Sequence, residues 1–228
     1  MKTYDPSVPL LSIHIPKCGG TSLLKTLKDW FGDGLLMHYF DERAGTMPKR
    51  HKLKHWYGGY RKDICIHGHF NGKRGFGVDD YYPGIGQAIT FLRDPLEMSL
   101  SVFHYNLRRA GDGKNYVEGK KVEPVSDIDE FLETTNPFVR NFLPRGMDET
   151  NMASYIGNYF VHIDVMENYQ RGIEVLAEKL GKPRVSIPHE NISKRAQEPS
   201  HTSISRFKER CGFEYKLYDL VLRANGLR

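Results

Sequence analysis

The feature that most constrains the fold is a strand–turn–helix pattern near the N-terminus. Residues 8–15 form an apolar run, which predicts a buried strand. The turn Pro16-Lys17-Cys18-Gly19-Gly20 follows, and Thr21 and Ser22 open a helical pattern that extends to Phe31. A glycine-rich turn before a helix directs backbone N–H groups and the positive end of the helix dipole at an anion. This stretch therefore predicts a site for a phosphate-bearing ligand, to which Lys17 adds a positive charge and Thr21 and Ser22 add hydroxyl donors.

The rest of the chain alternates between strand and helix patterns. Apolar runs predict strands at residues 35–40, 64–66, 87–92, 159–165 and 185–187. Helical spacing and caps predict helices over residues 95–107, 126–132 (capped by Ser126), 148–156, 168–180, 207–210 and 214–224. This alternation favours an α/β fold with three layers, in which helices flank a parallel sheet on both faces. With no internal repeat or linker, residues 1–228 are expected to form a single domain.

Two polar stretches are predicted to be loops. Residues 108–124 form the longest one and are expected to be a mobile loop or lid. Its cations could bind an acidic glycan or simply be solvated; they are Arg108, Arg109, Lys114, Lys120 and Lys121. Residues 190–205 are predicted to form the second loop.

Charge and cysteine usage exclude several classes of protein. The chain has 33 lysines and arginines against 28 carboxylates, a net charge of +5, which suits an anionic ligand but does not by itself indicate nucleic-acid binding. Its three cysteines are far apart, so neither a disulfide framework nor a zinc site is expected. No run approaches the roughly 20 apolar residues that span a bilayer. We therefore expect a soluble protein of a reducing compartment, without a membrane anchor in this chain.

The N-terminal turn differs from the loop of nucleoside triphosphatases. That loop places its lysine directly before the helical Ser or Thr, whereas Lys17 lies five residues ahead of Ser22. The spacing keeps the phosphate cradle but speaks against metal-dependent triphosphate chemistry, so no metal is expected.

Further candidate residues follow other predicted strands. Arg93-Asp94-Pro95 ends one strand and opens a helix, and His67-Gly68-His69 ends another strand. In parallel sheets, ligand sites lie at the carboxyl ends of strands, so one cleft is expected to gather these groups with Lys17. Histidine can take a proton near neutral pH. His14, His38 and His104 are weaker candidates for that role, and His14 is expected to pack beneath the first turn.

Residues 14–22 resemble the 5′-phosphosulfate-binding turn of sulfotransferases that use 3′-phosphoadenosine 5′-phosphosulfate (PAPS). The match is to the carbohydrate branch that includes the heparan sulfate and uronyl 2-O-sulfotransferases. The stretch from Arg93 to Ser101 resembles the 3′-phosphate motif of the same family, and His67-Gly68-His69 resembles a motif between the two. These patches all lie within residues 12–105.

The resemblance implies a P-loop-like sulfotransferase fold and transfer of a sulfuryl group from PAPS to a carbohydrate hydroxyl, with 3′,5′-ADP as the product. It implies that His69 is the base, His67 a supporting group and Lys17 the cation beside the leaving oxygen. The nucleotide would be held by Lys17, Cys18, Gly19, Gly20, Thr21, Ser22, Arg93 and Ser101. Cys18 stands where the family more often has Thr, which puts one hydroxyl contact in doubt. Lys194 and Arg195 belong either to a loop that closes over the nucleotide or to a basic surface loop.

Two other functions stay open at this point: a metal-dependent nucleotide kinase of P-loop type, and a non-catalytic glycan-binding relative. For the enzyme, an acidic glycan is the expected acceptor and nucleic acid is not an expected partner. The start at Met1 and the lack of an anchor favour a bacterial cytoplasmic enzyme over a trimmed catalytic domain from the Golgi lumen. The oligomeric state is not predicted.

Overall fold

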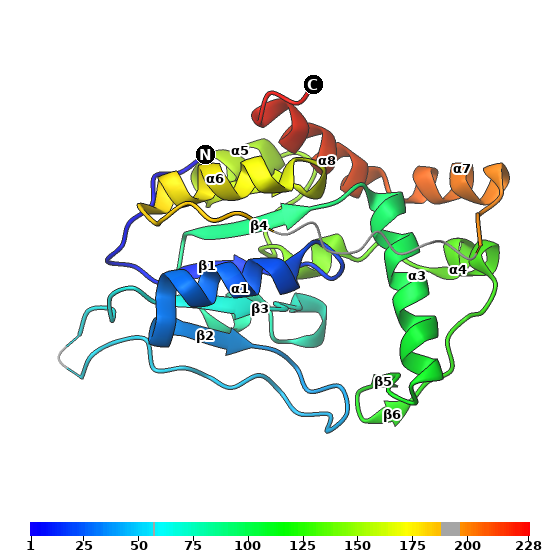
Figure 1. Ribbon diagram of the computed structural model, residues 1–228, viewed down its shortest axis with the longest axis horizontal. Helices are drawn as coiled ribbons and strands as arrows, with labels where there is room; N and C mark the ends of the chain where they lie inside the picture. Colours follow the sequence, from blue (N-terminus) through cyan, green and yellow to red (C-terminus); the bar gives the residue numbers. More distant parts are fainter. Residues whose placement is uncertain (57, 188–196) are drawn as a thin grey trace.

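The computed structural model describes residues 1–56, 58–187 and 197–228, and its centre is a parallel sheet of five strands (Figure 1). The strands are β1 (Leu10–Ile13), β2 (Leu35–His38), β3 (Cys65–Gly68), β4 (Ala88–Leu92) and β7 (Phe160–Val165). Their order across the sheet is β2-β3-β1-β4-β7, and all neighbours are parallel. All residues of β1, β3, β4 and β7 are buried, as expected for strands covered on both faces.

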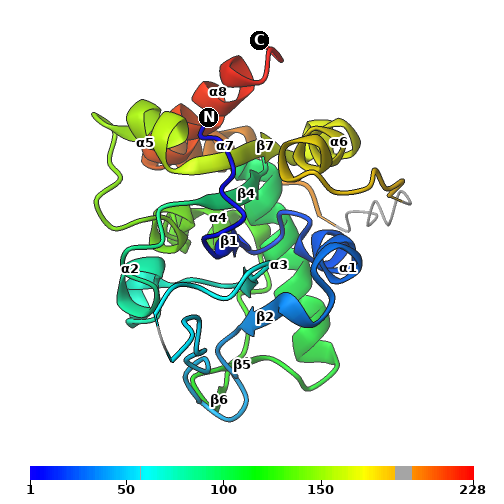
Figure 2. The same ribbon diagram turned by 90° about the vertical axis from the view of Figure 1, so that its left-hand side faces the viewer.

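Helices cover both faces of the sheet, which confirms the predicted three-layer α/β architecture (Figure 2). One face is covered by α1 (Gly20–Phe31) and α6 (Tyr169–Leu180). The other face is covered by α2 (Val78–Tyr81), α5 (Met152–Asn158) and α8 (Gly212–Ala224). Gly181 ends α6 in the left-handed conformation.

A third apolar cluster lies beyond the carboxyl ends of the strands. It is formed by α3 (Pro95–Gly111), α4 (Ile128–Thr134) and α7 (His201–Arg210), with Phe103, Leu132 and Phe207 at its centre. Figure 1 shows α3 running across the end of the sheet. Asp94 caps this helix by accepting hydrogen bonds from the N–H groups of Leu96 and Glu97. The cap and Pro95 explain why the helix begins directly after β4.

The structure corrects the predicted loop at residues 108–124. Helix α3 continues to Gly111, and β5 (Tyr116–Val117) and β6 (Lys120–Lys121) then form a short antiparallel hairpin. The last turn of α3 lies beyond Leu107, the last residue of its apolar stripe, so the sequence pattern did not indicate that the helix continues there. The hairpin contacts the loop after β2, since the Gly119 N–H donates to the carbonyl of Glu42 over 2.8 Å.

Other boundaries also differ from the sequence prediction. Asp127 rather than Ser126 caps α4, and β3 includes His67 and Gly68. Helix α7 includes the predicted helix at residues 207–210 but begins at His201, so residues 201–205, predicted to be loop, are helical. Residues 185–187, within the described part of the chain, form no strand. Short 3₁₀ helices cover Gly32–Gly34, Gly72–Arg74, Val139–Phe142 and Met166–Asn168.

Among the residues that the structure describes, no helix has the length and apolar character needed to cross a membrane.

Three fully buried histidines make the stability of the fold depend on pH. Burial lowers the pKa of His38 to about 4 and that of His67 and His162 to about 3, so all three stay neutral in the folded state. The unfolded chain takes up these protons near pH 6.5. The free energy of unfolding should therefore fall as the pH drops below 6.5, by about 1 kcal/mol per histidine over the first pH unit. Burial raises the pKa of Asp164 and Glu214, which offsets part of this loss.

Urea unfolding at pH 6.5 and pH 5.5 measures the effect. Burial also lowers the pKa of His14 and His69, so with all five histidines we expect a net loss of at most about 5 kcal/mol at the lower pH. A free energy of unfolding that stays constant or rises over this interval would contradict the assignment of neutral buried histidines.

Candidate functional site

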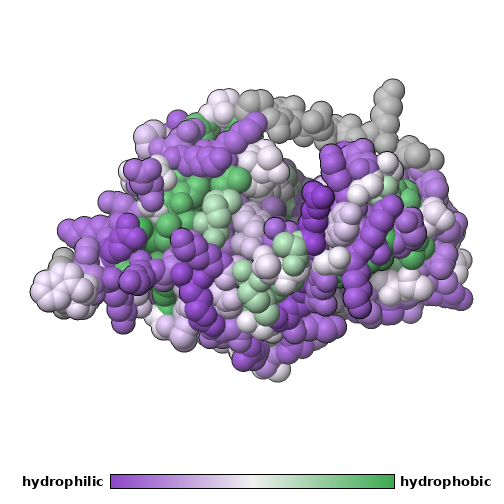
Figure 3. All heavy atoms as spheres, turned by 90° about the horizontal axis from the view of Figure 1, so that it is seen from below, coloured by the Kyte–Doolittle hydropathy of each residue, from purple (hydrophilic) through white to green (hydrophobic). Residues whose placement is uncertain are grey.

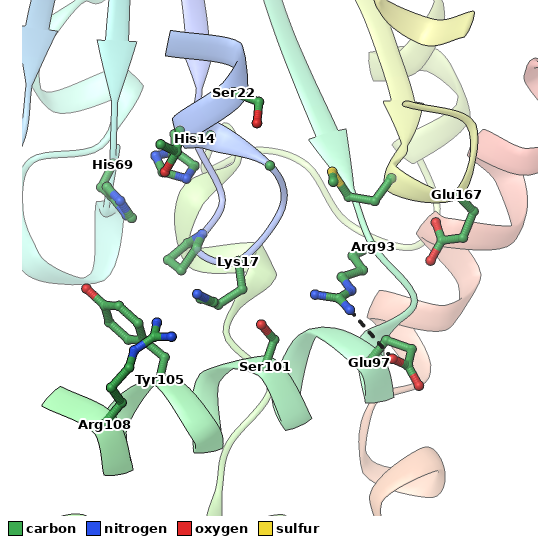
Figure 4. A pocket seen from close by; sticks show the side chains of 15 residues that line it. His14, Lys17, Ser22, His69, Arg93, Glu97, Ser101, Tyr105, Arg108 and Glu167 are labelled. Carbon is green, nitrogen blue, oxygen red and sulfur yellow. Dashed lines mark ion pairs between the residues drawn. The ribbon is translucent and has the colours of Figure 1, made fainter. Parts of the chain in front are cut away.

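A pocket of about 750 Å³ lies at the carboxyl ends of β1, β3 and β4, between the N-terminus of α1 and the side of α3 (Figure 4). The sequence-predicted groups that line it are Lys17, Gly19, Gly20, Thr21, Ser22, His69, Arg93 and Ser101. The expected cleft therefore gathers these residues from three strand–helix connections.

The turn after β1 presents backbone donors to this pocket. Gly19 adopts the left-handed conformation (φ 72°), and α1 begins at Gly20 without a side-chain cap from the described residues and without an acid in its first turn. The first N–H groups of a helix have no intrahelical partner, so those of Gly20, Thr21 and Ser22 can bind an anion. Gly20 is required for packing, because a Cβ there would lie 1.9 Å from Nε2 of His14.

Lys17 lies in this turn with an unusual backbone. Its φ of 65° is in the left-handed region that favours glycine, and its side chain extends into the pocket (Figure 4). The ammonium nitrogen lies 4.3 Å from the centroid of the Tyr105 ring, a cation–π distance. Burial lowers the pKa of Lys17, and the positive charges of Arg108 and Arg93 lower it further. An anion between these cations would relieve their mutual repulsion.

Arg93 and Ser101 form a second polar corner of the pocket. Arg93 follows β4, and Ser101 lies two turns into α3. One guanidinium nitrogen of Arg93 is 3.6 Å from a carboxylate oxygen of Glu97, and both side chains remain about one-third exposed. This ion pair holds the guanidinium at the rim of the pocket, where it can also bind an anion.

Two histidines line the pocket from neighbouring strands. The ring centroids of His14, after β1, and His69, after β3, are 4.4 Å apart. Nδ1 of His14 is 2.8 Å from the hydroxyl of Tyr39, which fixes the orientation of that ring. His14 thus both lies against Gly20, close to the expected packing, and lines the pocket.

Burial keeps both of these histidines neutral. It lowers the pKa of His69 to about 2, with further contributions from His14 and His67, and it lowers that of His14 to about 4, with a contribution from Lys17. At neutral pH each ring is therefore unprotonated, and burial makes it a weak proton acceptor unless negative charge binds beside it.

No model of a known protein family matches the chain, and no curated protein matches it either. Any functional assignment therefore rests on the residues of the pocket and on the resemblance of its motifs.

His67 lies behind the pocket rather than in it. Its side chain is fully buried, Nδ1 is 2.9 Å from Oγ of Ser12, and its ring stacks on His14 with centroids 5.4 Å apart and planes at 12°. It can support His14 by packing, but it does not contact the pocket directly.

Other predicted residues are also outside the pocket. The side chain of Cys18 is buried in the core, its thiol lies 3.7 Å from the Pro16 carbonyl, and its N–H donates to the Ile15 carbonyl, so the structure gives it no part in the cradle. His38 is buried against the carbonyl of Phe76, and His104 does not line the pocket. Lys194 and Arg195 lie outside the described residues.

The sequence prediction missed Tyr105 and Arg108 as pocket residues. Both belong to α3 and lie four and seven positions after Ser101, which places them on the same helix face. The helical spacing of Ser101, Tyr105 and Arg108 could have revealed this shared face, but Arg108 was assigned to a loop. Glu97, Met166 and Glu167 complete the lining on the Arg93 side.

These groups support a particular kind of chemistry. The pocket has one cationic corner at Lys17 and the start of α1 and a second at Arg93 and Ser101, and the neutral ring of His69 also lines it. This arrangement can hold a ligand with two separate anionic groups and accept a proton from a third group. Within the described residues, no group of three or more histidines, cysteines or carboxylates is placed to hold a metal ion.

Proposed function

We propose that the protein transfers a sulfuryl group from PAPS to a hydroxyl group of a carbohydrate. The observation that carries this proposal is the presence of two separate anion-binding corners in one pocket. One is the turn with Lys17 and the N-terminus of α1, and the other is Arg93 with Ser101. A nucleotide with both a 5′-phosphosulfate and a 3′-phosphate needs two such corners, whereas the phosphate chain of ATP needs only the first.

The residues present suit this donor. The N–H groups of Gly20, Thr21 and Ser22, together with Lys17, would bind the 5′-phosphate. The guanidinium of Arg93 and the hydroxyl of Ser101 would bind the 3′-phosphate. The uncapped start of α1 is consistent with a cradle that is completed by an anion.

In the proposed reaction, the acceptor oxygen attacks the sulfur atom in line with the bridging oxygen of the donor. A new S–O bond forms while the bond between sulfur and the bridging oxygen breaks, which releases 3′,5′-ADP. His69 takes the proton of the attacking hydroxyl on its free ring nitrogen. Lys17 stabilises the negative charge that develops on the leaving oxygen.

The acceptor side of the pocket also carries positive charge. Arg108 lines the pocket on the α3 side, and Arg109 and Lys114 lie near the end of the same helix. These cations support an acidic glycan as the acceptor, because carboxylate or sulfate groups on the glycan could pair with them.

Calorimetry with 3′,5′-ADP and with ATP–Mg²⁺ tests the donor assignment. We expect binding of 3′,5′-ADP without added metal, and transfer of labelled sulfate from PAPS to at least one member of a panel of glycans. Tight binding of ATP–Mg²⁺ alone would indicate a kinase. Nucleotide binding without transfer to any acceptor, or no nucleotide binding, would favour a non-catalytic glycan-binding protein.

Arg93→Ala is expected to weaken the binding of 3′,5′-ADP by about 10- to 100-fold, because it removes a charged hydrogen bond to the 3′-phosphate. The affinity for 5′-AMP, which lacks that phosphate, should change little. Calorimetry with both nucleotides separates a specific loss from a general one. Equal affinity of the parent protein and the variant for 3′,5′-ADP would remove Arg93 from the site.

A further inference from the structure

The positive charge of the chain is concentrated in one segment outside the pocket. Residues 49–62, here called the basic segment, contain six lysines and arginines and no carboxylate. They are Lys49, Arg50, Lys52, Lys54, Arg61 and Lys62. The rest of the chain therefore has 27 lysines and arginines against 28 carboxylates. The whole positive excess of the protein belongs to these 14 residues.

These six cations face the solvent and are not neutralised by the fold. All six are exposed, and none forms an ion pair with a carboxylate among the described residues. Arg50 lies over the Tyr81 ring at 4.0 Å and Lys54 lies 5.2 Å from the centroid of the Tyr60 ring. These contacts orient the two side chains without cancelling their charge.

The basic segment contains a projecting tip that carries a large aromatic side chain. Lys54 and Tyr60 form an antiparallel bridge, and the His55 N–H donates to the Gly59 carbonyl over 3.0 Å. Trp56 lies between these pairs and is 96% exposed. Figure 3 shows hydrophilic side chains gathered around this end of the molecule, on the left.

Trp56 is the most exposed of the large apolar side chains in the described residues. Away from the chain ends, the described part exposes five large apolar residues: Met37, Met47, Trp56, Val117 and Val122. Three lie on β2 or in the loop after it, and two lie in or beside the β5–β6 hairpin, which contacts that loop. Figure 1 shows the hairpin at the lower right, away from the tip that carries Trp56, which projects at the far left.

A groove of about 320 Å³ runs beside the tip. Its walls include His51, Lys52, Lys54, Tyr60 and Tyr81, so it offers positive charge next to aromatic surface. A phosphate headgroup could bind there while the tip enters the interface.

We propose that the basic segment attaches the protein to an anionic lipid surface, with Trp56 entering the headgroup region and the six cations pairing with lipid phosphates. Tryptophan favours the membrane interface, and clustered lysines and arginines are attracted to anionic lipids. A soluble polyanion would engage the cations but gives no reason for an exposed indole at a convex tip. This inference does not depend on the proposed sulfuryl transfer.

The full-length protein can be tested with vesicles of phosphatidylcholine alone and of phosphatidylcholine mixed with phosphatidylglycerol. We expect sedimentation with the mixed vesicles only, and its loss at high salt. Lys52→Ala/Lys54→Ala should weaken binding roughly tenfold or more, and Trp56→Ala several-fold. The matched control Lys28→Ala/Lys208→Ala, which removes exposed lysines from α1 and α7, should bind like the parent protein.

Tryptophan emission gives a second readout, because the chain has only two tryptophans and Trp30 is buried. Mixed vesicles should shift the emission of the parent protein to shorter wavelength, and Trp56→Phe should abolish the shift. The proposal is overturned if mixed vesicles do not sediment the protein, or if the two basic-segment variants bind like the control. It is also overturned if a soluble sulfated polysaccharide shifts the emission while vesicles do not.

Discussion

Lys17→Ala is expected to lower the turnover of sulfuryl transfer by about 10³-fold, because it removes the charge that stabilises the leaving oxygen. The loss should appear in kcat more than in KM, since the backbone N–H groups of the turn and Arg93 still hold the nucleotide. Single-turnover transfer of labelled sulfate at saturating PAPS measures it. A variant that keeps more than one-tenth of the parent rate would exclude Lys17 from this role.

The backbone of Lys17 supplies a matched control for folding. Its φ of 65° is strained for any residue except glycine, so Lys17→Gly should be about 1 kcal/mol more stable than Lys17→Ala. Both variants lack the ammonium and should be equally inactive. If Lys17→Gly regained activity along with stability, the defect of Lys17→Ala would be one of folding.

His69→Ala is expected to reduce turnover by about 10²- to 10⁴-fold while leaving the affinity for 3′,5′-ADP close to that of the parent protein. The side chain faces the pocket but belongs to neither anion-binding corner. Rate measurements on PAPS and an acceptor glycan, together with calorimetry on 3′,5′-ADP, separate these two effects. Full activity of His69→Ala would remove His69 as the base.

His14 is the matched comparison, because its ring lines the same pocket 4.4 Å from that of His69. If His14→Ala abolishes turnover while His69→Ala does not, His14 rather than His69 is the base.

The pH profile of kcat/KM adds an independent check. Burial lowers the pKa of both rings far below 6.5, so kcat/KM should not fall between pH 8 and pH 5 through their protonation. A bound anionic nucleotide should raise both pKa values, because negative charge favours the protonated ring.

The sequence predicted the parts of the site that depend on local patterns. An apolar run, a glycine pair and a helical stripe follow one another at residues 8–31, and this order led directly to β1, the turn and α1. The pairing of Arg93 with Ser101 came from the resemblance of this stretch to a 3′-phosphate motif, and the spacing of eight residues, about two helical turns, agrees with it. Parallel strands then place these groups at one edge of the sheet.

Other parts of the site depend on tertiary contacts that no local pattern reveals. The direction of the Cys18 side chain follows from the left-handed backbone at Lys17 and Gly19, which turns the thiol towards the core. Tyr105 lies within the predicted helix, but which face of that helix lines the pocket follows from the packing of Phe103 and Leu107 in the cluster with α4 and α7. Arg108 lies beyond the predicted end, because α3 continues to Gly111 through a polar stretch. Polarity alone made this stretch look like a loop.

The inward-facing thiol of Cys18 has a consequence for the reactivity of the protein. Burial raises its pKa to about 12, so at pH 7 the thiol stays protonated and the nucleophilic thiolate is scarce. Cys65 and Cys211, the other two cysteines, are also buried with raised pKa values. Alkylating reagents and mild oxidants should therefore spare the folded chain. A cysteine introduced on its surface would be the preferred target of a maleimide label.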